Sequence, residues 1–202
     1  MQTYYCYTDS PIGQLLLAGD ANGLSRIGFQ SGPCPVFPER EWRRDAAFFV
    51  NAIVQFNEYF TGERSQFCLR LHPVGSSFQL KVLEAVTRIP YGTTASYSDI
   101  AQLIQNPRAV RAVGAANRKN PLPIVIPCHR VIGRDGSLTG FNGGLERKEW
   151  LLDLEANPLN EKSALLNTSS RASETGLKRE MNADCAEMLG CVGSSRSVNG
   201  LT

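Results

Sequence analysis

The stretch PLPIVIPCHRV, residues 121–131, places a cysteine and a histidine inside an apolar run that three prolines stiffen. Apolar burial raises the pKa of a thiol, so Cys128 stays unreactive there unless a base or a dipole stands beside it. Pro127 fixes φ and lacks an N–H, which disfavours an ordinary central strand and favours a turn that directs the thiol. His129 is the candidate base. The pair predicts covalent catalysis, with a water carrying the proton between the two side chains.

Two other interpretations of this pair remain open. Free cysteine is among the most buried residue types, so Cys128 taken alone also fits an inert core position. A structural zinc site would need four ligands at close spacing. The chain holds only 2 histidines, His72 and His129, and its cysteines, at positions 6, 34, 68, 128, 185 and 191, form no close pair. We therefore expect neither a metal nor a cofactor.

The chain as a whole has the composition of an ordinary globular protein. With 202 residues, of which 42% are hydrophobic, it can bury one or two small cores. A basic segment followed by an apolar one is absent from the amino terminus, and no 18-residue apolar run occurs, which predicts neither export nor a membrane anchor. A reactive thiol needs a reducing compartment. We expect a cytoplasmic protein, nucleoid-associated in a bacterium or nuclear in a eukaryote.

Charge is unevenly distributed along the chain. The net charge is only +2, but residues 100–134 contain no Asp or Glu and six basic side chains: Arg108, Arg111, Arg118, Lys119, Arg130 and Arg134. A local excess of this kind is typical of a surface that contacts phosphates, and a solvated basic face is the alternative.

The amino-terminal part, residues 1–71, is predicted to be a small α/β scaffold domain. Residues 3–8, 14–18 and 24–29 have strand character and are separated by turn signals, among them Asn22-Gly23. A proline-rich loop follows at 31–40, then an apolar-rich helix over 46–60 and a further strand over 66–71. We find no catalytic set of residues in this part.

Residues 72–76 are the predicted linker to a helical second domain over 77–155. Ser76 with Gln79 forms a capping box that begins one helix, which ends at Pro90. Ser96 with Asp99 forms a second box at the start of a short helix.

A third helix is predicted to run to about Arg118, with Asn106 as its N-cap and Pro107 at its first helical position. With the preceding helix it makes a helix-turn-helix, whose second helix faces DNA. Arg111, Ala115 and Arg118 share one face of this helix, where Ala112 and Gly114 keep the surface low. One long side chain could then enter a narrow minor groove, although small residues also suit helix packing.

Glu155 ends a helix that begins at Leu145. It lies three and four residues after Leu152 and Leu151, so its carboxylate is expected on the buried side, where His129 is the natural partner. A surface glutamate at a frayed end is the alternative. The 47 residues of 156–202 contain no aromatic residue and no isoleucine, and we predict a mostly disordered tail.

Several motifs between residues 78 and 155 occur in the order that one known family shows. They are YG (91–92), SY (96–97), NP (106–107), RAVG (111–114), NP (120–121), PCHRV (127–131), GGL (143–145) and KEWLL (148–152). In these motifs, and in the turn SPIG at 10–13, the chain resembles the O6-alkylguanine-DNA alkyltransferases, also called methylated-DNA–protein-cysteine methyltransferases. The resemblance implies an α/β (α+β) fold with a helix-turn-helix and an active-site cysteine turn.

The resemblance also implies roles for individual residues. Cys128 accepts the alkyl group, His129 takes the thiol proton, Glu155 holds His129, and Asn120 braces the cysteine turn. The implied substrate contacts are Tyr97, Pro123, Val131, Phe141 and Asn142, and the implied DNA contacts are Arg111, Ala112, Gly114, Ala115 and Arg118. Phe141 stands where many members have tyrosine, so a hydroxyl contact is lost. Of the zinc ligands known in some members, only His72 is present, and Asp20 replaces a cysteine.

The implied activity is a single transfer of alkyl from O6-alkylguanine in duplex DNA to Cys128 by a monomer, after the base has left the stack. It leaves O4-alkylthymine open as a second substrate. Two alternatives remain: a non-catalytic member that only recognises alkylated bases, and a plain helix-turn-helix DNA-binding protein in which Cys128 is structural.

Overall fold

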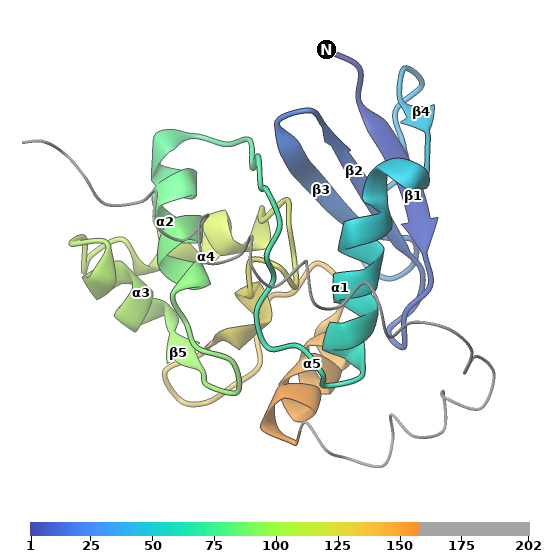
Figure 1. Ribbon diagram of the computed structural model, residues 1–202. Helices are drawn as coiled ribbons and strands as arrows, with labels where there is room; N and C mark the ends of the chain where they lie inside the picture. The colour runs from blue at the N-terminus through green and yellow to red at the C-terminus, as the bar shows by residue number, and fades with distance from the viewer. Residues whose placement is uncertain (158–202) are drawn as a thin grey trace, which may run out of the picture. The chain divides into compact units, whose positions relative to one another are not determined.

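The computed structural model describes residues 1–157. Residues 158–202, and with them nearly all of the tail for which we predicted disorder, lie outside the described residues. The described chain has an amino-terminal half built on a sheet and a carboxyl-terminal half built mainly from helices (Figure 1). This is the mixed α/β arrangement that the sequence predicted.

The sheet of the amino-terminal half has four strands in the order β3-β2-β1-β4. Its antiparallel part is β1 (Tyr4–Thr8), β2 (Leu15–Asp20) and β3 (Gly23–Phe29), which confirms the three predicted strands; the two-residue β4 (Arg43–Arg44) pairs in parallel with β1. The turn between β2 and β3 requires glycine, because Gly23 has a φ of 135° and a Cβ there would collide with the carbonyl of Arg70.

Helix α1 (Val50–Phe60) lies against this sheet and follows a short 3-10 turn, η1 (Ala47–Phe49), in agreement with the predicted helix over 46–60 (Figure 1). The predicted strand over 66–71 is wrong. Only Leu71 forms an isolated bridge, to Leu24. The side chain of Gln55 instead satisfies the backbone of Cys68, donating to its carbonyl at 2.8 Å and accepting from its N–H at 2.7 Å. β3 pairs with this segment only at Leu24, whose N–H donates to the carbonyl of Arg70 and whose carbonyl accepts from the N–H of His72, both at 2.8 Å.

The carboxyl-terminal half packs α2 (Ser77–Thr87), α3 (Tyr97–Leu103) and α4 (Val110–Arg118) together, beside a short parallel pair, β5 (Ala95–Ser96) and β6 (Val131–Ile132). The capping box of Ser96 and Asp99 forms as predicted. The box of Ser76 and Gln79 is only half formed, because the Gln79 side chain donates to the carbonyl of Lys119 at 2.9 Å.

The predicted start of α4 is wrong by about three residues. The helix begins at Val110, and its N-cap is Ala109. Asn106 instead starts a turn, since its carbonyl accepts a hydrogen bond from the N–H of Ala109 at 2.9 Å. Pro107 therefore lies within that turn and not at the first helical position.

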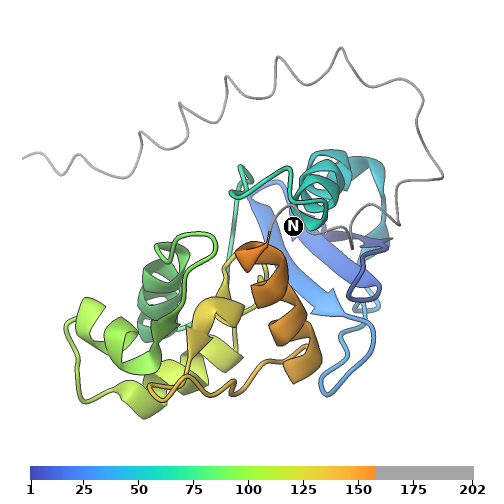
Figure 2. The same cartoon turned by 90° about the horizontal axis from the view of Figure 1, so that it is seen from below.

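Helix α5 (Leu145–Ala156) lies between the helices of the second half and the sheet of the first (Figure 2). Its Trp150 ring packs on Phe60 of α1, with ring centroids 6.0 Å apart. Arg147 donates to the carbonyls of Ile12 and Ser31 in the amino-terminal half and to the carbonyl of Gly143. Both halves thus contact α5, which carries Glu155 into the interior.

Candidate active site

Cys128 begins a one-turn 3-10 helix, η2 (Cys128–Arg130), directly after Pro127, which confirms the predicted turn. Asn120 spans the loop that leads to this turn. Its side-chain amide donates to the carbonyl of Ile126 at 2.8 Å, and its side-chain oxygen accepts from the N–H of Leu122 at 3.0 Å. Between these two points Ile124 has a φ of 77°, a strained conformation for a β-branched residue. Asn120 is therefore placed to hold a loop that would otherwise relax.

The Cys128 thiol is buried, and 5% of the residue is exposed. Burial raises its pKa, and the hydrogen bond from Asn120 and the charge of Lys148 lower it only in part. Lys148 is itself fully buried; its ammonium group donates to the carbonyls of Val131 at 2.7 Å and Thr139 at 2.8 Å, and burial lowers its pKa to about 8. The thiol in this site therefore needs a base to remove its proton.

His129 is fully buried next to Cys128 and contacts Glu155, as predicted, with Nε2 2.8 Å from Oε1. Burial alone would raise the pKa of Glu155, but hydrogen bonds from His129 and Arg130, together with their charges, lower it to about 2. The ionised carboxylate can only accept, so Nε2 carries the hydrogen and Nδ1 is the basic nitrogen. Nδ1 is buried and makes no hydrogen bond within residues 1–157. Burial also lowers the pKa of His129, which keeps the ring neutral at neutral pH.

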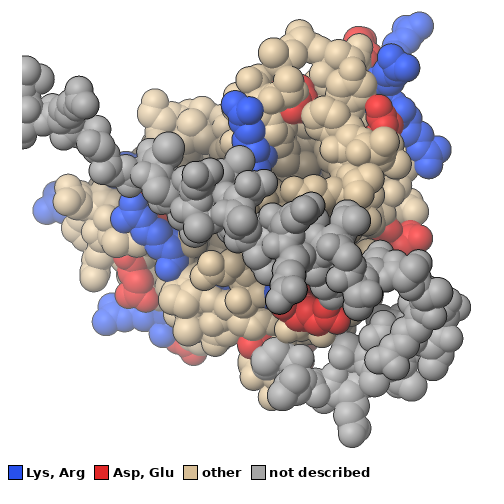
Figure 3. All heavy atoms as spheres, viewed as in Figure 1, with Lys and Arg blue, Asp and Glu red and all other residues tan. Residues whose placement is uncertain are grey.

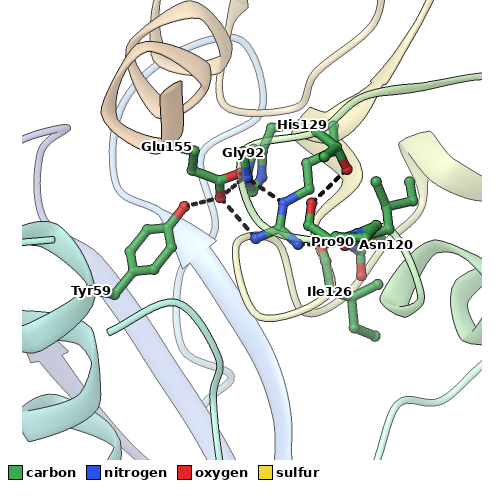
Figure 4. Close-up of polar contacts among 10 residues, drawn as sticks. Tyr59, Pro90, Gly92, Asn120, Ile126, His129 and Glu155 are labelled. Atoms are coloured by element: carbon green, nitrogen blue, oxygen red, sulfur yellow. Dashed lines mark hydrogen bonds and ion pairs between the residues drawn. The ribbon is translucent and has the colours of Figure 1, made fainter. Parts of the chain in front are cut away.

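The carboxylate of Glu155 is the centre of a buried hydrogen-bond network (Figure 4). Oε1 accepts from the Tyr59 hydroxyl at 2.6 Å, from His129 and from Arg130 Nη2 at 2.9 Å. Oε2 accepts from Arg130 Nε at 2.8 Å and from the backbone N–H of Gly92 at 3.2 Å. Arg130 was predicted as part of a basic surface, and this is wrong: the residue is 7% exposed and pairs with a buried carboxylate.

A small cavity of about 10 Å³, the space of about one water, adjoins Cys128. Besides Cys128, its walls include five predicted site residues, namely Arg118, Asn120, Pro123, Phe141 and Asn142, together with Asn117 and Gly140. Two predicted contacts do not line it. The Tyr97 hydroxyl donates to the carbonyl of Thr139 at 3.2 Å, and the carbonyl of Val131 is bonded to Lys148. The Asn142 side chain joins two residues of the cavity wall by donating to the carbonyl of Arg118 at 2.5 Å.

The five predicted DNA contacts lie along one side of α4. Arg111, Ala112, Ala115 and Arg118 are exposed and Gly114 is half-buried, whereas Val113, Ala116 and Asn117 face the core. Gly114 lies next to the ring of Tyr97: a Cβ added at Gly114 would be 3.8 Å from the nearest ring atoms. The exposed charged side chains of α4 are both arginines, whereas basic and acidic side chains are interspersed on the face of the protein drawn in Figure 3.

Besides Arg130 and the backbone N–H of Gly92, three residues join this site that the sequence did not suggest. Lys148 shares a helix face with Leu151 and Glu155, so the spacing that located Glu155 could have found it. Asn117 donates to the carbonyl of Cys128 at 3.3 Å from the buried side of α4. Tyr59 belongs to the half that we predicted to be only a scaffold, and no local signal marks it.

The rest of the described chain offers no second candidate for chemistry. Within residues 1–157 no three His, Cys, Asp or Glu side chains gather as metal ligands; His72 Nδ1 lies 4.0 Å from Asp20 Oδ1. A hollow of about 760 Å³ lies between turns of the amino-terminal half and the start of α5. None of the predicted site residues lines it; its walls are Pro11, Ile12, Gly13, Gly32, Pro33, Gly143, Gly144, Leu145, Glu146, Arg147 and Trp150.

Two family descriptions match adjacent parts of the sequence. The DNA-binding domain of 6-O-methylguanine DNA methyltransferase matches residues 77–157, and the ribonuclease-like domain of the same family matches residues 3–73. The methylated-DNA–protein-cysteine methyltransferase of Methanosarcina barkeri is 48% identical over 156 residues, which cover 77% of this chain and 99% of that protein. The protein of the same name from Mycobacterium tuberculosis is 46% identical over 153 residues, which cover 75% of this chain and 92% of that protein.

Solved structures show the same similarity in three dimensions. The crystal structure of Mycobacterium tuberculosis OGT in complex with DNA superimposes with a TM-score of 0.74 at 42% identity, covering 81% of this chain and 99% of that one. The structure of Mycobacterium tuberculosis O6-methylguanine methyltransferase gives a TM-score of 0.73 at the same identity, covering 82% of this chain and all of the other.

Proposed function

Because this chain belongs to the 6-O-methylguanine DNA methyltransferase family, we propose that it repairs DNA by moving the alkyl group of O6-alkylguanine onto Cys128. It is an alkyl-transferring, DNA-binding protein. Cys128 is assigned as the alkyl acceptor because it lies in a buried group with His129 and Glu155. In it an ionised carboxylate fixes the histidine tautomer and leaves Nδ1 free to act as a base.

The transfer itself is a displacement at the alkyl carbon. The sulfur of Cys128 forms the new S–C bond as the C–O6 bond breaks, and the electron pair of that bond returns to the guanine. The thiol proton passes to His129 Nδ1 through a water, and the base regains a proton to become guanine. Glu155 stabilises the imidazolium that forms. A thioether has no easy leaving group, so each protein molecule reacts once.

Base binding requires the loop over the cavity to move. About 10 Å³ beside Cys128 holds no base, and the loop residues 140–142 form one part of the cavity wall. In this proposal that loop opens when the base enters, Phe141 and Pro123 form the apolar wall, and Tyr97 contacts the base from the start of α3. Val131 and Asn142 contribute their backbone groups.

On the DNA side, we propose that α4 lies in the minor groove and that Arg111 fills the position which the extruded base leaves. The small exposed side chains of Ala112 and Ala115 support this placement, because they let the backbone of α4 come close to the duplex. Arg118 is exposed at the end of the same helix, where it can meet a phosphate. Affinity should depend on salt and hardly on sequence.

The decisive experiment is mass spectrometry of the protein after incubation with a duplex that carries O6-methylguanine. We expect the mass of one methyl group on Cys128, at most one equivalent per molecule, and none in a Cys128→Ser variant. A methyl group on another residue, or turnover beyond one equivalent, contradicts the assignment. A footprint at one defined operator on undamaged DNA, with affinity about 10³-fold above non-specific binding, would favour a helix-turn-helix regulator instead.

The remaining expectations stay proposals: residues 1–71 and 77–155 as two domains joined by 72–76, a monomer, and a cytoplasmic or nuclear location. The break between the matched regions 3–73 and 77–157 supports the domain boundary. A thiol nucleophile persists only in a reducing compartment, which supports the location. No helix within residues 1–157 is long and apolar enough to cross a membrane.

A further inference from the structure

One side chain of the amino-terminal half reaches the proposed proton-transfer residues. Tyr59, near the end of α1, donates its hydroxyl to Glu155 Oε1 at 2.6 Å, although the two residues are 96 positions apart in the sequence (Figure 4). The same oxygen accepts from His129 Nε2 at 2.8 Å. Tyr59 and His129 therefore share one carboxylate oxygen.

The position of this hydroxyl is tightly determined. Tyr59 has no exposed surface, and its ring packs against the rings of Phe60, Phe67 and Tyr91 at centroid distances of 5.4, 5.2 and 6.1 Å. Burial and the charge of Glu155 raise the pKa of Tyr59 well above its ordinary value. The phenol is therefore a neutral donor at neutral pH.

We propose that Tyr59 is a positioning residue that holds Glu155 Oε1 in line with His129 Nε2, so that the amino-terminal half takes part in the proton transfer. This inference rests on the proposed function. The carboxylate already receives five hydrogen bonds, about as many as its lone pairs accept. Without the Tyr59 hydroxyl, Arg130 could turn the carboxylate away from the histidine.

The hydroxyl also affects the basicity of His129. The ring faces Glu155, whose charge and hydrogen bond raise its pKa, and Arg130 and Lys148, whose charges lower it. The Cys128 thiol is the neighbouring residue, and Tyr59 and Tyr91 are the phenols packed around Glu155. When Oε1 turns away from Nε2–H, the ring loses part of the interaction with Glu155 that raises its pKa. Removal of the Tyr59 hydroxyl therefore lowers the pKa of His129.

The test compares Tyr59→Phe with Tyr91→Phe. Both changes remove one buried phenolic oxygen from the same aromatic cluster, but the Tyr91 hydroxyl makes no hydrogen bond within residues 1–157. We expect Tyr59→Phe to slow methyl transfer to Cys128 by about tenfold, a small part of what a general base contributes. The acid limb of its pH-rate profile should also move to lower pH, by about half a unit. Tyr91→Phe should leave both quantities unchanged.

Imidazole NMR measures the second effect directly. The chain has only 2 histidines, and the exposed His72, assigned with a His72→Gln variant, serves as the internal reference. The His129 titration should move in Tyr59→Phe. A slower Tyr59→Phe protein with a lower melting temperature but an unmoved His129 titration would mean a purely structural role, and it would overturn the inference.

A double variant tests whether Tyr59 acts through Glu155. In a Glu155→Gln background, Tyr59→Phe should cost less than about twofold, because the interaction it serves is already gone. A further tenfold loss contradicts the inference. The proposed function fails separately, if the wild-type protein leaves Cys128 unmethylated. If instead the wild type reacts and Tyr59→Phe equals Tyr91→Phe in rate and in His129 titration, only the inference is wrong.

Discussion

Replacing Glu155 by glutamine should destabilise the fold far more than the same replacement in an exposed ion pair. Glu155 and Glu84 each contact an arginine at 2.8 Å, but the Arg130–Glu155 side chains are 8% and 1% exposed and the Arg88–Glu84 side chains 63% and 60%. The glutamine amide keeps one acceptor oxygen and turns an NH₂ group toward groups that themselves donate. Arg130 then remains charged and buried without a counterion, at a cost of about 3–5 kcal/mol.

The exposed pair gives the matched control. Its Glu84→Gln variant should lose only about 0.3–0.5 kcal/mol, because water screens the pair and solvates the arginine left behind. Urea unfolding at pH 7.5, followed by far-UV circular dichroism, measures the free energy of unfolding of both variants and the wild type. A loss below about 1 kcal/mol for Glu155→Gln, or equal losses for the two variants, would refute the view that burial makes this network costly to break.

Three further predictions concern the reaction. Arg111→Ala should slow repair of duplex DNA by about 10- to 100-fold, since base extrusion costs a few kcal/mol, and leave any reaction with free O6-benzylguanine within about twofold; equal losses on both substrates would mean that Arg111 is structural. Asn142→Ala removes the hydrogen bond to the Arg118 carbonyl that joins two parts of the cavity wall, so the rate with benzyl should rise relative to that with methyl in a competition assay. An unchanged ratio contradicts the loop-opening proposal. The lowered pKa of His129 places the acid limb of the pH-rate profile below pH 6.5. The unfolded chain binds this proton at a higher pH than the folded chain does, so the free energy of unfolding should also fall as pH drops through this range. A kinetic midpoint at or above 6.5 would show that the ring is not held neutral.

The sequence by itself determined those features whose signals act over a few residues. Pro127 predicted the turn at Cys128 because it removes a backbone donor and fixes φ at one position. The spacing of Glu155 from Leu151 and Leu152 predicted its burial because helical periodicity depends on no distant partner. The three strands and the Asn22-Gly23 turn were likewise local predictions.

Only the tertiary structure decided which distant groups meet. Counting charge along the chain could not separate Arg130 from its exposed basic neighbours, because its burial depends on a carboxylate 25 residues away. The sequence around Tyr59 does not indicate its role, because its hydroxyl meets Glu155 only when α1 packs near the end of α5. Tyr97 and Val131 lie outside the cavity wall and bond to Thr139 and Lys148, contacts between segments that local sequence patterns do not reveal. Local sequence patterns restrict single elements, whereas contacts across 25 to 96 residues follow from how those elements pack.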